Sequence, residues 1–207
     1  LRWVVGFMFG PSTVLAHRDI TYIDEQLLDQ SAPREEYRLR VVPSRIYEGI
    51  PHGDLQYWCA VRAFYGLPTT ELVAWLSDQI GGRCTIEVGS GTGALGRALG
   101  IPRTDSFNQQ QPDVALLYAL SGQQVIAYGS DVERLEALDA VKKYRPKVVV
   151  GQWVTEYVAP GETPGPGGGS VYGLKERDIL AQPCVDAYVV VGNSSIHGLK
   201  SIAREVP

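Results

Sequence analysis

Cysteine is scarce in this chain, and its three positions, Cys59, Cys84 and Cys184, lie far apart with no CxxC pair. A sparse, odd-numbered set argues against both a disulfide framework and a zinc knuckle. The three histidines form no metal-ligand spacing with cysteine, aspartate or glutamate. We therefore expect reduced, buried thiols and no metal site.

A long apolar run and a strong charge of one sign are also missing. No segment approaches the ~20 apolar residues that a membrane span needs. Residues 3–9 faintly resemble the apolar part of a signal peptide, but only Arg2 precedes them and Gly10-Pro11 interrupts the run. The net charge of −4 at pH 7 disfavours nucleic-acid binding through a global positive field. We expect a cytoplasmic protein without membrane contact; whether it forms an oligomer stays open.

What the chain does contain suits one sizeable α/β domain, or a compact domain with a helical extension. It has 207 residues, of which 44% are hydrophobic and 20% charged. Residues 1–80 show no regular strand–helix alternation and are predicted to form a mostly helical cap. Within them Thr69 suits the N-cap of an amphipathic helix that ends at Gly81-Gly82. The aromatic-rich segment 57–65 is interpreted as a core helix or as part of a substrate pocket.

From residue 81 to residue 207 the pattern changes to alternating strands and helices. The expected strands cover 84–88, 101–105, 124–128, 147–153 and 186–192, and the expected helices cover 94–99, 112–120, 131–143 and 175–180. Such alternation implies right-handed crossovers and a doubly wound, mostly parallel sheet. Ligands bind this kind of sheet outside the carboxyl ends of its strands, which is where functional residues are expected.

The most informative segment is Glu87-Val88-Gly89-Ser90-Gly91-Thr92-Gly93, between an expected strand and an expected helix. Its alternate glycines let the backbone turn sharply and approach a ligand closely. The segment resembles motif I of the class I S-adenosylmethionine-dependent methyltransferases, whose pattern is acid-x-Gly-x-Gly-x-Gly. The resemblance implies a Rossmann-like core, S-adenosylmethionine as cofactor, and methyl transfer to an unidentified small-molecule or macromolecular acceptor.

The same resemblance assigns roles to individual residues. Glu87 would hold the amino end of the cofactor. The loop residues expected under its methionine part are Gly89, Ser90, Gly91 and Gly93. Asp105, 18 residues after Glu87, would bind the ribose hydroxyls, because a carboxylate accepts two hydrogen bonds at once. Asp131, after the expected third strand, would lie near the adenine, although it equally suits a helix N-cap without any ligand.

Residues after the fourth and fifth strands are expected to face the substrate. Trp153 and Tyr157 are the expected substrate contacts. If the acceptor must lose a proton, Glu156 or His197 is the expected base; an exposed loop histidine is the alternative for His197. The Pro/Gly-rich segment 159–170 is interpreted as a closing loop or as a plain flexible connection.

Departures from the family pattern leave two alternatives open. The family core usually has seven strands, whereas only residues 193–207 follow the fifth expected strand, so the sheet is expected to be truncated. A non-catalytic nucleotide-binding or assembly module on the same fold is one alternative. An NAD-binding oxidoreductase is the other, because residues 91–96 also fit GxGxxG. This fold needs an acidic residue about 20 positions after the first glycine; Asp105 comes too early, and Asp113 falls in an expected helix.

Overall fold

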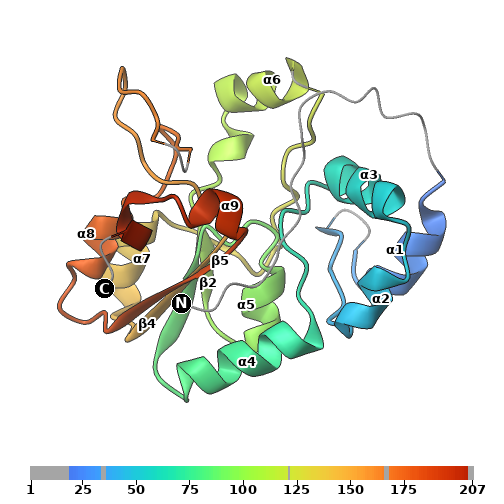
Figure 1. The fold of residues 1–207 in the computed structure, drawn as a ribbon, viewed down its shortest axis with the longest axis horizontal. Coiled ribbons are helices and arrows are strands. Elements are labelled where there is room, and N and C mark those ends of the chain that lie inside the picture. Colours follow the sequence, from blue (N-terminus) through green and yellow to red (C-terminus); the bar gives the residue numbers. More distant parts are fainter. Residues whose placement is uncertain (1–18, 34–35, 121, 166–167, 205–207) are drawn as a thin grey trace.

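The computed structural model describes residues 19–33, 36–120, 122–165 and 168–204. The segment that resembles a signal peptide lies outside these residues. The described chain forms one sheet surrounded by helices (Figure 1). The five strands of that sheet are β1 (Thr85–Val88), β2 (Arg103–Asp105), β3 (Glu133–Arg134), β4 (Val148–Gln152) and β5 (Ala187–Val191).

All neighbouring strands pair in parallel, in the order β3-β2-β1-β4-β5. The chain runs outward from β1 to β3 and then returns to the other side of β1 with β4 and β5. This is the strand order of a Rossmann-like core, and the expected α/β fold with a parallel sheet is confirmed. The point at which the order reverses lies between β1 and β4, where ligands bind in open α/β sheets.

Helices cover both faces of the sheet. Those of the described chain are α1 (Thr21–Leu27), α2 (Ser44–Glu48), α3 (His52–Arg62), α4 (Thr70–Ile80), α5 (Ala94–Leu99), α6 (Pro112–Leu120), α7 (Ala137–Tyr144), α8 (Glu176–Leu180) and α9 (Ser194–His197), with short 3₁₀ turns at Asn108–Gln110 and Ser201–Arg204. The helices α4 and α5 pack on one face, and α7 and α8 on the other.

Alternation along β4 explains the two covered faces. Val148 and Val150 pack with Leu76 of α4, whereas Val149 packs with Val141 of α7 and Ile179 of α8. Successive side chains of a strand point to opposite faces, so a strand covered on both sides must be apolar throughout. The continuous apolar run in the sequence therefore reflects a buried parallel strand.

Residues 21–80 contribute α1 to α4. Trp58 of α3 is fully buried beside Leu27 of α1, in a cluster that also includes Ala94 of α5. The helix α4 begins as the sequence predicts, with the Thr69 hydroxyl accepting a hydrogen bond from the backbone N–H of Leu72 at 3.0 Å. Because α4 packs on the sheet, residues 70–80 form part of the layered core rather than of the helices before them.

The structure corrects the expected third strand and the helix after it. Residues 124–128 contain no strand, β3 lies inside the segment expected to be helical, and α7 begins only at Ala137. Val132 lies against Gly93 on the α5 side, whereas Leu135 packs with the α7 cluster. Their three-residue spacing thus reflects the two faces of an extended segment and not one face of a helix.

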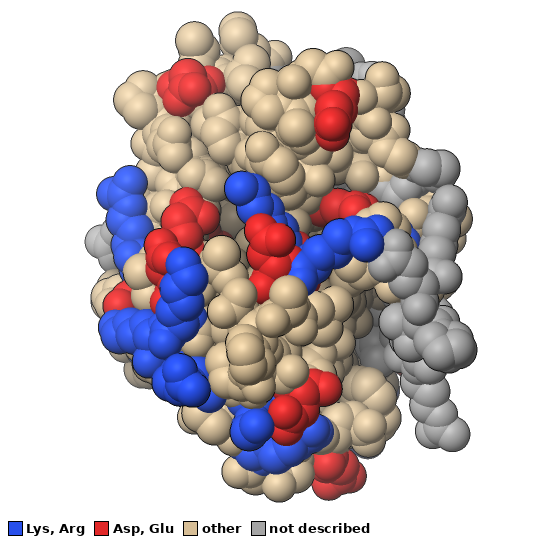
Figure 2. Space-filling view, turned by 90° about the vertical axis from the view of Figure 1, so that its left-hand side faces the viewer, with Lys and Arg blue, Asp and Glu red and all other residues tan. Residues whose placement is uncertain are grey.

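The surface carries interspersed charges on the face shown in Figure 2. Ion pairs join Lys143 to Glu133 at 2.5 Å and Lys147 to Asp186 at 3.2 Å. None of the helices in the described ranges is long and apolar enough to cross a membrane.

The thiols differ in exposure. Cys59 is buried, Cys184 is half-buried and Cys84 is exposed. The expected burial therefore holds for Cys59 and is wrong for Cys84.

Replacing Leu76 with alanine should destabilise the fold by about 2–5 kcal/mol, because its side chain is fully buried between α4 and the sheet. Urea denaturation followed by circular dichroism measures the loss. Leu116→Ala on α6, where the side chain is 58% exposed, is the matched control and should change stability by less than about 0.5 kcal/mol. Equal losses in the two variants would contradict the packing of α4 on the sheet.

Candidate functional site

The loop of residues 89–93 connects β1 to α5 at the point where the strand order reverses. Its three glycines have positive φ values of 59°, 56° and 74°. Residues with a Cβ rarely adopt this left-handed conformation. The glycines are therefore required by the path of the backbone, which turns tightly from strand to helix.

The register between β1 and β4 brings this glycine loop beside the end of β4. Val88 pairs with Gly151, so Gly89 and Gln152 are the residues that directly follow a paired position at the ends of the two strands. A Cβ on Gly89 would lie 2.8 Å from Cγ1 of Val154. The glycine loop and the chain that follows β4 thus form one continuous edge.

The carboxyl group of Glu87 lies beneath the loop, against α5. The side chain is 0% exposed, and Oε2 accepts a hydrogen bond from the backbone N–H of Gly96 at 2.8 Å. A Cβ on Gly96 would lie 2.5 Å from that oxygen, so glycine is needed there. In this position Glu87 holds α5 close to β1 and does not face the space above the glycines. The contact with the amino end of a cofactor that motif I implies stays a prediction.

Burial dominates the electrostatics of Glu87. Desolvation raises its pKa to about 8, because the charged form is costly in a site shielded from water. The second oxygen, Oε1, is buried and has no hydrogen-bond partner. The raised pKa favours the protonated carboxyl group at neutral pH in the folded protein.

Asp105, at the carboxyl end of β2, lies next to the glycine loop. Oδ2 accepts a hydrogen bond from the backbone N–H of Gly91 at 2.9 Å, and Oδ1 accepts one from that of Phe107 at 2.9 Å. The Tyr128 hydroxyl also donates to this carboxylate, whose pKa burial raises. The backbone N–H of Ser106 contacts it as well. A carboxylate has about four acceptor positions, so the backbone contacts leave one, which the Tyr128 hydroxyl holds.

Asp131 is not where the sequence places it. It precedes β3 instead of following the third strand, and the N-cap position of α7 belongs to Glu136. Its carboxylate binds the guanidinium groups of Arg97 at 2.6 Å and Arg103 at 2.7 Å, and the hydrogen bond from Arg97 is the main cause of its lowered pKa. The N-cap prediction is therefore wrong, whereas the contact with the adenine stays a prediction. In the structure Asp131 joins α5 to β2.

The expected bases are engaged with the C-terminal segment. Glu156 accepts hydrogen bonds from the backbone N–H and the hydroxyl of Ser201. His197 is only 4% exposed, so the exposed-loop alternative is wrong, and burial lowers its pKa. Its ring meets Trp153 edge-on, with ring centroids 5.0 Å apart. The ammonium nitrogen of Lys175 lies over the ring of Tyr157, 4.8 Å from the centroid of that ring.

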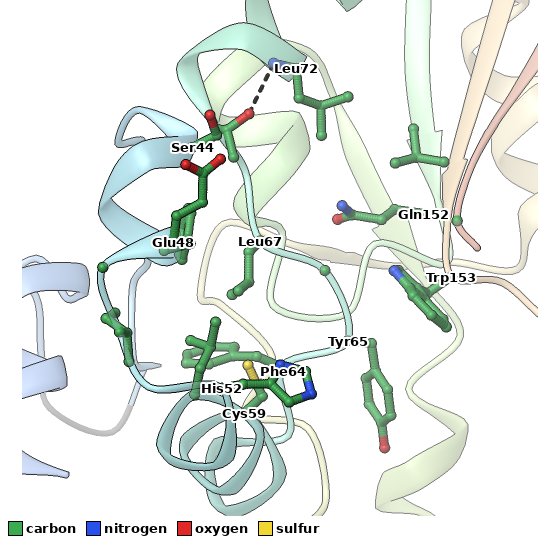
Figure 3. A pocket seen from close by; sticks show the side chains of 18 of the residues that line it. Ser44, Glu48, His52, Cys59, Phe64, Tyr65, Leu67, Leu72, Gln152 and Trp153 are labelled. Carbon is green, nitrogen blue, oxygen red and sulfur yellow. Dashed lines mark hydrogen bonds between the residues drawn. The ribbon is translucent and has the colours of Figure 1, made fainter. Parts of the chain in front are cut away.

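A pocket of about 630 Å³ opens at the carboxyl ends of β4 and β5, on the face that α4 covers (Figure 3). Its walls come from α2, α3, the segment 64–69 and the ends of the two strands. Trp153, an expected substrate contact, lines the pocket, whereas Tyr157 and the two expected bases, Glu156 and His197, are not among its lining residues.

Trp153 has a φ of 54° and donates its backbone N–H to the carbonyl oxygen of Val191 at 2.8 Å. A bulky residue in this conformation is strained, a feature common at binding sites.

The core interpretation of the aromatic-rich segment 57–65 is confirmed for Trp58, Cys59 and Phe64, which lie in one core cluster. Cys59, Phe64 and Tyr65 also line the pocket, and its use by a substrate stays a prediction. The other lining residues that sequence reasoning missed are Tyr47, Leu55, Leu67 and Leu72. No local pattern distinguishes them from core residues, because only the tertiary fold brings their segments to the end of β4.

Comparisons with known proteins identify no relative. No protein-family model matches the chain, and no curated protein or solved structure matches it either. Any functional inference therefore depends on the fold and on the geometry of this edge.

The pH dependence of stability tests the buried state of Glu87. The folded protein keeps the group protonated up to about pH 8, whereas the unfolded chain releases the proton near pH 4.5. The folded state therefore binds more protons between these values, and the free energy of unfolding falls as the pH rises through this window. For this one group the slope is at most about 1.4 kcal/mol per pH unit.

Glu87→Gln keeps the shape of the side chain and cannot ionise, so it should make the decline between about pH 5 and pH 8 shallower by up to that slope. Urea denaturation across this range measures the difference, and the exposed Glu25→Gln should retain the wild-type profile. An unchanged slope in Glu87→Gln would show that Glu87 is ionised in the folded protein.

Proposed function

We propose that this protein binds S-adenosylmethionine at the glycine loop and transfers its methyl group to an acceptor held in the adjacent pocket. The observation that carries the proposal is the shared edge between the two. The loop has the sequence pattern of methyltransferase motif I and lies where the strand order reverses. Gln152, which lines the pocket, directly follows Gly151, and Gly89 directly follows Val88, the strand partner of Gly151.

The proposed cofactor site extends from the loop toward β2. Asp105 would bind the ribose hydroxyls with the acceptor capacity that its backbone contacts leave. Beside it Phe107 and Tyr128 stack, with ring centroids 4.0 Å apart and an interplanar angle of 7°. Aromatic faces of this kind stack with nucleobases, so this pair is the proposed surface for the adenine. Ile126, near Gly91, and Val154, near Gly89, would shift as the cofactor enters.

The chemistry that this arrangement can perform is direct displacement at the sulfonium. A lone pair of the acceptor forms a bond to the methyl carbon as the carbon–sulfur bond breaks, and sulfur keeps that electron pair as the neutral thioether of S-adenosylhomocysteine. The protein would accelerate the step mainly by holding acceptor and methyl group in line. Since Glu156 and His197 are engaged elsewhere, a proton lost by the acceptor would pass to water.

A non-catalytic binding module is the second candidate function. The described residues form five strands, whereas the core of the resembled family usually has seven. Cofactor binding without methyl transfer to any tested acceptor would favour this candidate over an enzyme.

Calorimetric titration with S-adenosylhomocysteine tests the cofactor site. The wild-type protein should bind it, and Gly91→Ala should bind at least about tenfold more weakly, because the methyl group strains the left-handed backbone and occupies part of the space beside the loop that the cofactor would take. Gly82→Ala is the matched control, since Gly82 also has a positive φ but has nothing within 4 Å of an added Cβ. It should bind like the wild type.

NAD serves as the competing ligand in the same experiment. We expect no NAD binding. Binding of NAD in place of S-adenosylhomocysteine would contradict the proposed function and favour an oxidoreductase.

A further inference from the structure

We infer that the pocket at the end of β4 takes a neutral, flat aromatic small molecule with a hydrogen-bonding group that Gln152 recognises. The ligand class follows from the pocket alone. Its role as methyl acceptor rests on the proposed function.

The size of the pocket fits a small molecule. Its volume of about 630 Å³ lies within the range of roughly 300–1,000 Å³ that is typical of small-molecule sites. The inner wall consists of buried side chains with little or no polarity, namely Leu55, Cys59, Phe64 and Leu72. A ligand that fills this space would leave water almost completely.

The charge of the lining favours a neutral ligand. Among the lining residues only Glu48 carries a full charge, and it is exposed at the mouth together with the titratable His52. The inner part offers no counter-ion. An ionised ligand would be desolvated there without a partner, which costs several kcal/mol.

Aromatic side chains form rigid walls. Trp153 is fixed by its backbone hydrogen bond to Val191 and by the His197 ring, and Tyr65 by hydrogen bonds with Tyr118 and Gln109. In Figure 3 Trp153 and Tyr65 lie on the same side of the pocket. Fixed aromatic rings favour aromatic ligands, since ring pairs gain attraction beyond the area that they bury.

Gln152 supplies the polar contact. Its side-chain amide points into the pocket in Figure 3, is half-buried, and makes no hydrogen bond with any residue in the described ranges. Its polar atoms are not among the buried unpaired atoms of the described residues, so they are open to water. A ligand that displaces this water must replace its hydrogen bonds. A hydroxyl or ring N–H of the ligand would satisfy the amide oxygen.

The position of Gln152 also orients the ligand. Because Gln152 directly follows Gly151, the strand partner of Val88, a group bound to it lies at the edge where the methyl donor is proposed. For a phenolic ligand, the hydroxyl oxygen would form the new bond to the methyl carbon, the carbon–sulfur bond would break with its electron pair on sulfur, and the hydroxyl proton would pass to water.

Titration of the full chain with 2-naphthol and with indole, followed by calorimetry, tests the inference. Saturable one-to-one binding of either probe is expected, with 2-naphthalenesulfonate, a charged molecule of similar shape, binding at least about tenfold more weakly. Leu67→Trp should abolish binding, because Leu67 lies in the pocket wall within an irregular segment that tolerates a larger side chain. Leu116→Trp makes the same change on exposed α6, outside the pocket lining, and should bind like the wild type.

The role of Gln152 has its own comparison. Gln152→Leu keeps the size of the side chain and removes its hydrogen bond, so 2-naphthol should bind about tenfold more weakly while naphthalene binding stays unchanged. Equal losses for both molecules would overturn the role of Gln152. Absence of binding by 2-naphthol and indole, or equal binding to Leu67→Trp and wild type, would overturn the inference as a whole.

Repeating the titration with S-adenosylhomocysteine present separates the pocket from the proposed function. Binding of 2-naphthol without any binding of S-adenosylhomocysteine would support the pocket and contradict the methyltransferase. Binding of S-adenosylhomocysteine without binding of 2-naphthol or indole would support the cofactor site and contradict the inference about the pocket.

Discussion

The parallel pairing of β1 with β4 is the constraint on which the candidate site depends. Val88, the last residue of β1, lies beside Gly151, and β4 continues for one more residue to Gln152. The glycine loop therefore begins beside the end of β4. A shift of β4 by one residue would turn Gln152 to the opposite face of the sheet, toward α7 and α8 and away from the pocket. The buried valines of β4 fix the register, because each face of the sheet has its own cluster of helices.

Two acidic residues hold the glycine loop from different sides. Glu87 holds α5 through the backbone of Gly96, and Asp105 holds the loop itself through the backbone of Gly91. Both carboxyl groups are buried, and burial raises the pKa of each. Glu87 therefore has a structural task in this protein, and Asp105 is the carboxylate that contacts the glycine loop itself.

Local sequence patterns predicted those elements whose signals do not depend on distant parts of the chain. The bounds of α5 and α6 agree with expectation, and α4 begins and ends at its predicted Thr69 and Gly81 caps. The two-residue strand β3 was missed because Val132 and Leu135 suit a helix as well as an extended segment. Motif I identified the loop, but the direction of the Glu87 side chain depends on how α5 packs. The pocket depends on contacts between residues 44–72 and the end of β4, which no local pattern encodes.

The most direct measurement of the central claim is a crystal structure of the protein with S-adenosylhomocysteine. The account predicts electron density above residues 89–93, with the ribose at Asp105, the base against Phe107, and the sulfur toward Gln152. A structure obtained at saturating ligand in which this space is still filled by Ile126 and Val154, with the nucleoside bound elsewhere or not at all, would contradict it.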